Sequence, residues 1–595
     1  MSSMSAPSEL STAVNTTGST TPQVELTDQT NRLPFNKLLP IFAGLALCVV
    51  VSSLDSVIVA TVIPTISTSF NAGSVVSWVP SAYLLTSTCF LPLYGRFSDI
   101  FGRKSALIIA MSLFMIGNLL AGFSKTIIQV IVFRGLAGAG GGGLVSMSQI
   151  VISDIVSLRE RGKYQGIISG GMSSVVDAKF DAHGTHTVIA IGYCLGPVIG
   201  GAFAQKLEWE WCFWVTLPVS FLATCVVAFI LPLKPVQGQI RSKLLAVDYV
   251  GTLLTLVGCT LFILPLIWGG VTFPWTSPMV LAPLLSAFVV VAIFCLWEWK
   301  GAQLPIVPSA DVYQWFRILL DAILPSPNFS KLPSGMTPST PVFSSWGCGM
   351  LVSHTGHYRM IINSGFAVWS IACGLISTIQ PRSPKPLLVV YMILAGVGAG
   401  QTMQTSTVAV QASVPRRDMA VVTAMRNFIR LLGGTLSLAV AATLLNNELR
   451  TAMAALNLPP SQISQIIDDP VRLHIPASVG VSTDIAKSIL DRGYAKGFSS
   501  LFIMNAALTV FATLVSVVMI KHKELSRDDD EMLRQKAIRE VLQTKFGMVS
   551  GAGTLASGTA TPIDGITSGT VTPRDLESGL ALATQEGAVM VQMSK

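Results

Sequence analysis

A carboxylate and a guanidinium deep inside two long apolar stretches of this sequence could do chemistry. Asp55 interrupts the stretch LDSVIVATVIP, and Arg134 opens the glycine-rich stretch RGLAGAGGGG. A charge inside a membrane is costly, so it is usually paired or functional. Burial favours the neutral form of a carboxylate, which makes Asp55 a candidate for taking up and releasing a proton. A permanently charged arginine that faces a cavity could tune such a carboxylate or steer a substrate. The alternative for Asp55 is a structural pairing with a polar group on a neighbouring helix.

A second group of charges separates two apolar stretches, in the sequence GRFSDIFGRK. The first glycine allows a tight helix end and the second a close turn. The aspartate can pair with an arginine or lysine across the turn, or cap the next helix. We interpret the cluster as a charged latch that can be remade when the protein changes conformation, since ordinary cytoplasmic charges would not need these residue types at these spacings. Its residues are Gly95, Arg96, Asp99, Gly102, Arg103 and Lys104.

A third pattern is GYCLGPVIGG, which combines small residues with a proline. Gly192, Gly196 and Gly200 share one helix face at spacings of i, i+4 and i+8, and small residues let helices approach closely. Pro197 removes a backbone hydrogen bond and favours a kink. Together with Gly201, the pattern favours a pliable, closely packed helix over generic small-residue packing.

Other patterns that could bind a ligand are weaker. The glycines after Arg134 match the dinucleotide fingerprint GxGxxG, but they follow no strand, so we expect no nucleotide site there. His183 and His186 have no evident third ligand, and we expect no metal site. Asn328 lies in an N-x-S sequon and is a glycosylation candidate. No catalytic constellation appears, so we expect neither an enzyme nor a cofactor.

The composition predicts a membrane protein. Of the 595 residues, 51% are hydrophobic and only 12% are charged, against about a quarter charged in soluble domains. Twelve apolar stretches each approach the length of a spanning helix, about 17 to 25 residues. Helices are expected because hydrocarbon leaves no other partner for the backbone polar groups. The stretches are Leu38–Ile63, Val75–Leu93, Ser105–Phe123, Ile127–Ile152, Thr187–Ala204, Trp211–Leu231, Val247–Trp268, Pro278–Trp297, Ile361–Ile379, Leu387–Ala412, Phe428–Leu445 and Ser499–Ile520.

The loops between these stretches set the orientation. Lysines and arginines concentrate in alternate loops, which places those loops and both termini in the cytosol. The net charge of +8 therefore reflects the positive-inside pattern, and no nucleic-acid partner is expected.

The expected organisation is a bundle on each side of a linker. It comprises a disordered N-terminal tail (1–37), a six-helix N-terminal bundle (38–231), two linker helices (232–300), a C-terminal helix bundle (301–520) and a largely disordered cytosolic tail (521–595). Residues 446–497 are expected to form a long external loop. Two segments, 173–187 and 308–349, are too polar for the pattern. We hypothesise that the first is translated intron and the second a reading-frame error.

These motifs together resemble those of the fungal drug:proton antiporters in the 14-helix branch of the major facilitator superfamily. The resemblance extends over most of the chain from Pro34 to Lys521. GRFSDIFGRK matches the family's loop between helices 2 and 3, RGLAGAGGGG its fourth-helix motif and GYCLGPVIGG its fifth-helix antiporter motif. The chain departs from the family in having about twelve good spans, and in carrying Glu210 where relatives commonly have arginine.

The resemblance implies an all-α integral membrane protein of two six-helix bundles plus linker helices. It implies proton-coupled export of an amphipathic small molecule, such as a fungal secondary metabolite, mycotoxin or drug. Asp55 would carry the proton and Arg134 would couple it. The expected partners are this substrate, protons and the lipid bilayer, for a monomer in the plasma membrane or the vacuolar membrane. No cofactor is implied beyond the proton gradient.

Two other functions stay open at this stage. An importer of sugar or siderophore on the same fold would lack the Gly-Pro pattern of the fifth helix. A non-transporting membrane sensor would need a folded effector segment in its cytosolic tail, and the Gly/Ser/Thr-rich composition of Gly547–Lys595 predicts disorder instead.

Overall fold

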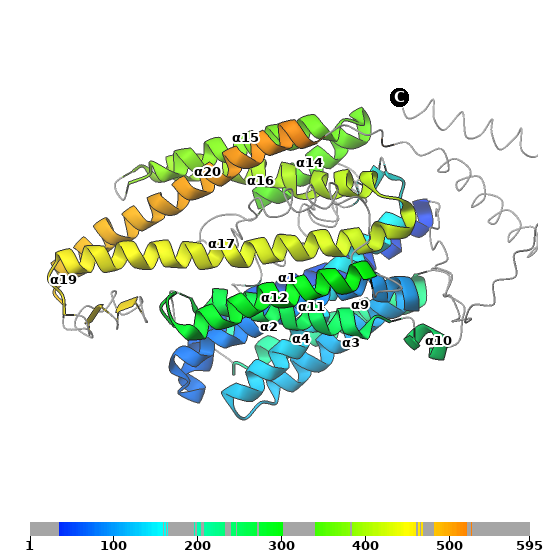
Figure 1. Cartoon of the computed structure of the whole chain (residues 1–595), viewed down its shortest axis with the longest axis horizontal. Coiled ribbons are helices and arrows are strands. Elements are labelled where there is room, and N and C mark those ends of the chain that lie inside the picture. The colour runs from blue at the N-terminus through cyan, green and yellow to red at the C-terminus, as the bar shows by residue number, and fades with distance from the viewer. Residues whose placement is uncertain are drawn as a thin grey trace, which may run out of the picture. The chain divides into compact units, whose positions relative to one another are not determined.

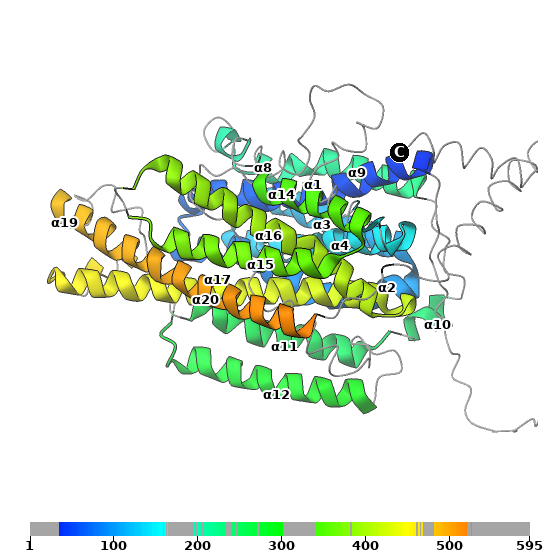
Figure 2. The same cartoon turned by 90° about the horizontal axis from the view of Figure 1, so that it is seen from above.

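The computed structural model describes the membrane-embedded part of the chain. The described residues are 35–158, 160–161, 164, 196, 199–203, 208–231, 240–245, 247–269, 273–300, 339–380, 383–459, 462–463, 466–467, 481–520 and 525. Their regular structure is helical apart from one isolated bridge between Gly269 and Phe273. Figures 1 and 2 show the long helices running side by side.

The N-terminal half is organised around a central helix, α4. Both α2 and α3 pack along α4, while α1 packs against α9 and α4. A 3₁₀ turn, η1, leads into α2. The bounds are α1 Phe35–Phe70, η1 Gly73–Ser77, α2 Trp78–Phe101, α3 Arg103–Gly122, α4 Ile127–Ile155, α8 Trp211–Trp214 and α9 Thr216–Ile230.

The linker forms a helical hairpin. It consists of the short α10 (Ile240–Leu245), followed by α11 (Tyr249–Trp268) and α12 (Pro278–Lys300). Asp248 caps α11 by accepting a 2.8 Å hydrogen bond from the Gly251 amide, and the Trp297 indole of α12 donates to the same carboxylate at 3.1 Å. One carboxylate thus fixes the start of α11 and holds the two linker helices together.

The C-terminal half is organised around α15 and α16. Here α15 packs against α16 and α20, and α14 packs against α16. A π-helical turn, η6, runs directly into α20. The bounds are α14 Ser339–Thr355, α15 Tyr358–Ser377, α16 Lys385–Ser413, η3 Arg416–Asp418, α17 Met419–Ala455, α19 Thr483–Ser488, η6 Ile489–Tyr494 and α20 Ala495–Met519.

Eleven helices among the described residues are long and apolar enough to cross a membrane. Large apolar side chains are exposed on their outer faces, for example Leu285 at 64% and Val518 at 75%. Water would not favour such a surface, whereas lipid does. The expected multi-pass helical architecture is confirmed.

Several expected boundaries are wrong. The α2 helix continues to Phe101, so Gly95, Arg96 and Asp99 lie in a helix and not in a loop. Gly102, with φ of 95°, is the turn. The charges do not end α2 because the fold pairs and buries them.

The external loop expected at 446–497 is shorter than predicted. The α17 helix runs on to Ala455, and helical residues resume at Thr483. The α14 helix occupies 339–349, the end of a segment that had no expected span, and it is not among the helices long and apolar enough to cross. Polar side chains at these positions obscured the helices in a hydropathy reading.

Some expectations fall outside the described residues. They concern the N-terminal tail up to residue 34, the segments 173–187 and 308–338, the C-terminal tail beyond 525, and the residues Gly192, Pro197, His183, His186 and Asn328.

The two halves share their packing at one end only, as far as the described residues show. At the predicted cytosolic end, Leu91 of α2 clusters with α16 and α17, and Ala420 and Ala424 of α17 join the N-terminal cluster. At the opposite end, the cluster around Ile58 and Phe213 contains N-terminal residues alone. The two halves are therefore closed together at the end predicted to be cytosolic.

Candidate functional site

The side chains of Asp55 and Arg134 meet in the N-terminal half. The Arg134 Nη1 atom of α4 lies 3.0 Å from Asp55 Oδ1 and 2.9 Å from Asp55 Oδ2 of α1. Asp55 is 0% exposed and Arg134 is 1% exposed. A buried charge of either sign alone would be expensive, so each charge makes the other tolerable.

Three further side chains enclose this pair. Asn118 of α3 accepts a 3.1 Å hydrogen bond from Arg134 Nη1 through its Oδ1 atom. The guanidinium lies over the Tyr83 ring of α2 at 4.4 Å and over the Phe213 ring of α8 at 5.7 Å. Aromatic faces attract a desolvated cation. The pair therefore lies among five elements of the N-terminal half: α1, α2, α3, α4 and α8.

Glycines allow these elements to approach so closely. A β-carbon at Gly117 of α3 would lie 2.6 Å from the Ala137 Cα atom of α4. One at Gly138 would lie 2.8 Å from the Tyr83 Cα atom, and one at Gly142 would lie 3.0 Å from the Ser87 Cα atom. No side chain fits at these distances, so the glycine run places α2 and α3 against α4. Its function here is packing that brings Tyr83 and Asn118 to Arg134.

The charged latch is a buried network. Arg103 Nη1 lies 2.5 Å from Asp99 Oδ1, and Arg103 Nε lies 2.7 Å from Asp154 Oδ2 at the end of α4. Ser98 Oγ accepts a further bond from Arg103 at 2.8 Å, and Arg96 lies 3.7 Å from the Asp99 carboxylate. Arg103 thus joins α2, the start of α3 and the end of α4. Lys104 is only partly buried.

Gly95 has a different function from the one expected. A β-carbon there would lie 2.9 Å from the Val421 Cα atom and 3.1 Å from the Ala424 side chain, both on α17. The glycine does not end a helix; it permits α2 of the N-terminal half to contact α17 of the C-terminal half backbone to backbone.

Another buried arginine, Arg161, joins the two halves beside this contact. Arg161 Nε donates to the Val156 carbonyl at 3.3 Å, and its Nη2 atom donates to the Ser153 carbonyl, so it satisfies the end of α4. Its Nη1 atom lies 3.0 Å from Met419 Sδ and 3.5 Å from Gln411 Oε1 in the C-terminal half.

A direct amide bond spans the same junction. Asn427 Nδ2 of α17 donates to Gln149 Oε1 of α4 at 2.8 Å. Arg426 holds the Asn427 side chain by donating to its Oδ1 atom at 3.1 Å, and it also donates to the Met403 carbonyl of α16. Polar groups from α4, α16 and α17 therefore form a continuous set of contacts between the halves.

The expected antiporter helix is described only in part. Residues 196 and 199–203 are helical. A β-carbon at Gly196 would lie 2.7 Å from Val57 Cγ1, and one at Gly200 would meet Thr61 and lie 3.1 Å from the Ile58 carbonyl. Gly196 and Gly200 therefore face α1, which carries Asp55, whereas a β-carbon at Gly201 would meet nothing within 4 Å.

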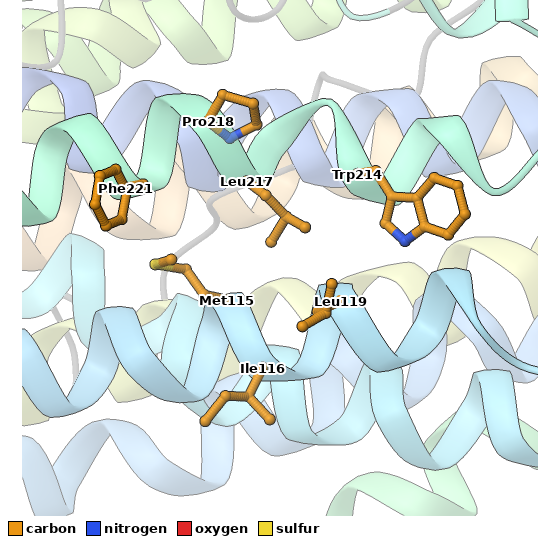
Figure 3. A pocket seen from close by; sticks show the side chains of 7 residues that line it. All are labelled: Met115, Ile116, Leu119, Trp214, Leu217, Pro218 and Phe221. Carbon is orange, nitrogen blue, oxygen red and sulfur yellow. The ribbon is translucent and has the colours of Figure 1, made fainter.

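An apolar groove lies apart from these contacts, between α3 and α9 (Figure 3). Its volume is about 500 Å³, and it is lined by Met115, Ile116, Leu119, Trp214, Leu217, Pro218 and Phe221. Phe221 is 61% exposed and Ile116 is 48% exposed, which is typical of a lipid-facing surface.

Comparison with known proteins identifies the family. The family model of the major facilitator superfamily matches residues 45–438, about two thirds of the chain. The chain belongs to the major facilitator superfamily. An efflux pump, dotC of Dothistroma septosporum, is 31% identical over 83% of this chain and 86% of its own length.

Other members extend this relationship. Citrate exporter 1 of Yarrowia lipolytica is 29% identical over 87% of this chain and 77% of its own length. Among solved structures, a double-tryptophan mutant of XylE has a TM-score of 0.50 at 12% identity, covering 83% of this chain and 98% of that chain. This likeness confirms the facilitator fold.

The structure brings some of the predicted motif residues of this facilitator into contact with one another. Asp55 and Arg134 pair, as do Asp99 and Arg103. Sequence reasoning missed the residues that complete these sites, because asparagine, tyrosine and glutamine within spans are common. They are Tyr83, Asn118, Gln149, Asp154, Arg161 and Asn427. The one available signal was polarity: Asn118, Gln149 and Asn427 are amides within otherwise apolar helices.

Proposed function

We propose that this chain is a proton-coupled efflux transporter that exports an amphipathic small molecule, of the kind made as fungal secondary metabolites. The observation that carries the proposal is the buried Asp55–Arg134 pair, next to the glycine helix that packs on α1. The relatives include an efflux pump and a citrate exporter, which supports the outward direction.

The proposed mechanism couples proton binding at Asp55 to a change in the packing of the two halves. In this mechanism Asp55 carries its negative charge in the described arrangement and holds Arg134. A proton that reaches Asp55 from outside removes its charge and weakens the ion pair. The α1 helix then repacks against α4 and against the helix of Gly196 and Gly200, and the contacts between the halves at the cytosolic end open. Release of the proton into the cytosol restores the pair. No cofactor takes part, and the monomer is sufficient.

The mechanism demands that the cytosolic contacts break and reform. The Arg161 contacts and the Gln149–Asn427 bond join the halves at that end, and the latch around Arg103 lies beside them within the N-terminal half. They are neutral or charge-paired in the closed state, so opening exposes them to water, which can replace their bonds at modest cost. The few ionised groups within the spans suit a substrate that is largely apolar. We place the protein in the plasma membrane, with the vacuolar membrane as the alternative.

The proposal is tested with the full chain reconstituted in proteoliposomes. Rhodamine 6G serves as the amphipathic probe, and an imposed pH gradient drives its movement while valinomycin clamps the membrane potential. We expect uphill dye transport in exchange for protons, abolished by nigericin. Transport that is unchanged when the gradient is collapsed would contradict proton antiport. Metabolite profiles inside and outside cells lacking the gene would identify the natural substrate.

A further inference from the structure

One nitrogen of the Arg134 guanidinium donates hydrogen bonds to two different side chains, a carboxylate and an amide. Its Nη1 atom donates to both Asp55 oxygens, at 3.0 and 2.9 Å, and to Asn118 Oδ1 at 3.1 Å. Asn118 is 0% exposed, and its neutral amide cannot change charge at any pH. One acceptor can therefore be neutralised by a proton, and the other cannot.

We infer that Asn118 is a positioning residue that keeps Arg134 in place while Asp55 carries a proton, and so sets the pH at which the transporter changes conformation. The inference rests on the proposed proton coupling. A buried guanidinium that loses its carboxylate is strongly unfavourable unless other acceptors remain. Asn118 Oδ1 and the Tyr83 ring, 4.4 Å away, are the acceptors that remain.

The surroundings contain few other groups that could titrate. From α2, Tyr83 faces the pair, and its hydroxyl lies 3.3 Å from Ser52 Oγ. From α3 comes Asn118, and from α8 the Phe213 ring, neither of which titrates. Among the described residues packed around the pair, Asp55 is therefore the one carboxylate, the group whose charge a proton can remove.

The inference predicts shifts of opposite sign for two substitutions. Asn118→Leu removes the acceptor that is needed when Asp55 is neutral, so protonation becomes harder and the conformational change moves to lower pH. Asn118→Asp adds a second carboxylate beside Asp55, and like charges favour retention of a proton, so the change moves to higher pH. Each shift should be about one pH unit, the effect of one hydrogen bond to a charged group.

The experiment measures conformation without needing the natural substrate. Spin labels are placed at the predicted outer ends of the two halves, on Ser69→Cys of α1 and Ala454→Cys of α17, in a Cys295→Ser background reconstituted in nanodiscs. Both labelled positions are exposed. Electron–electron distance distributions are recorded across a pH series, and the midpoint of their change is compared between variants. The parent without the two introduced cysteines gives the labelling background.

A matched control separates positioning from general loss of a buried amide. Asn363 of α15 bonds Ser516 of α20 in the C-terminal half, so Asn363→Leu should lower stability without moving the midpoint. Midpoints that move in opposite directions for the two Asn118 variants support the inference. Midpoints that stay in place, or move together, overturn it. If Asn118→Leu does not fold, the test rests on Asn118→Asp: a midpoint at higher pH supports the inference, and an unchanged midpoint overturns it.

The outcome also separates this inference from the proposed function. A wild-type protein whose distances ignore pH argues against proton coupling, and the inference fails with it. A wild-type protein that responds to pH, with unshifted Asn118 variants, leaves proton antiport standing and removes Asn118 from the mechanism.

Discussion

Asn427 of α17 donates a 2.8 Å hydrogen bond to Gln149 of α4, and this bond joins the two halves of the transporter directly. Both side chains are buried, at 1% and 6% exposure. The two residues are 278 positions apart in sequence, so the bond depends on how the two halves pack against each other.

Loss of this bond should favour the open cytosolic end. Gln149→Leu removes a net contribution of about 0.5–1.5 kcal/mol from the closed state, or up to about tenfold in the equilibrium. We expect the outer-end distance between labels at Ser69→Cys and Ala454→Cys to shift toward its shorter population. Gln129→Leu, at the exposed start of the same helix, should leave the distribution unchanged. A shift in the control as large as in Gln149→Leu would contradict the assignment.

The Asp55–Arg134 pair predicts that losing one charge destabilises the protein more than losing both. Asp55→Asn leaves a buried arginine without its counter-charge, which should cost about 3–5 kcal/mol in stability. Asp55→Asn combined with Arg134→Gln removes both charges and should recover most of that loss. Thermal unfolding of the detergent-solubilised proteins measures this.

Transport by the same variants separates stability from coupling. Uphill, gradient-driven dye transport should be absent in both, because neither can carry the proton at this position. A double variant that still pumps uphill would show that the proton binds elsewhere.

The structure of the latch predicts that removing Arg103 lowers stability and transport far more than removing its neighbour Lys104. Arg103→Ala leaves Asp99 and Asp154 buried without their common partner, so we expect a loss of about 3–5 kcal/mol in stability together with loss of transport. Lys104→Ala, one residue away and partly exposed, should change stability by no more than about 0.5 kcal/mol. The two variants are compared by unfolding temperature and initial transport rate. Equal effects would mean that the cluster acts only as cytosolic positive charge.

Two adjacent glycines provide a steric test on the fifth-helix motif. A β-carbon at Gly200 meets Thr61 and Ile58 of α1, whereas one at Gly201 meets nothing within 4 Å. Gly200→Ala should therefore push the helix from α1 and abolish transport. Gly201→Ala should be neutral or stabilising, by up to about 1 kcal/mol, because alanine favours a helix over glycine. Normal transport by Gly200→Ala would show that the close approach to α1 is dispensable.

Much of this architecture was predictable because the insertion of a helix into a membrane depends on residues that are close together in the sequence. Runs of apolar residues near the bilayer thickness predict helices wherever they occur, and the cations between them predict orientation. The motif left two roles open for Asp99, pairing with an arginine or lysine across the turn or capping the next helix, and the structure shows pairing with Arg103. Helix ends were less predictable, as the buried charges of α2 show.

The sequence by itself determined that the chain is a multi-pass helical membrane protein of this superfamily, and it singled out Asp55, Arg134 and the latch. Only the tertiary structure decided their partners: Asn118 and Tyr83 around Arg134, Asp154 for Arg103, and Asn427 for Gln149. The physical reason is that hydropathy and helix formation depend on neighbours along the chain, whereas a buried polar group takes its partner from another helix, and common amides and aromatics give no local sign of which helix that will be.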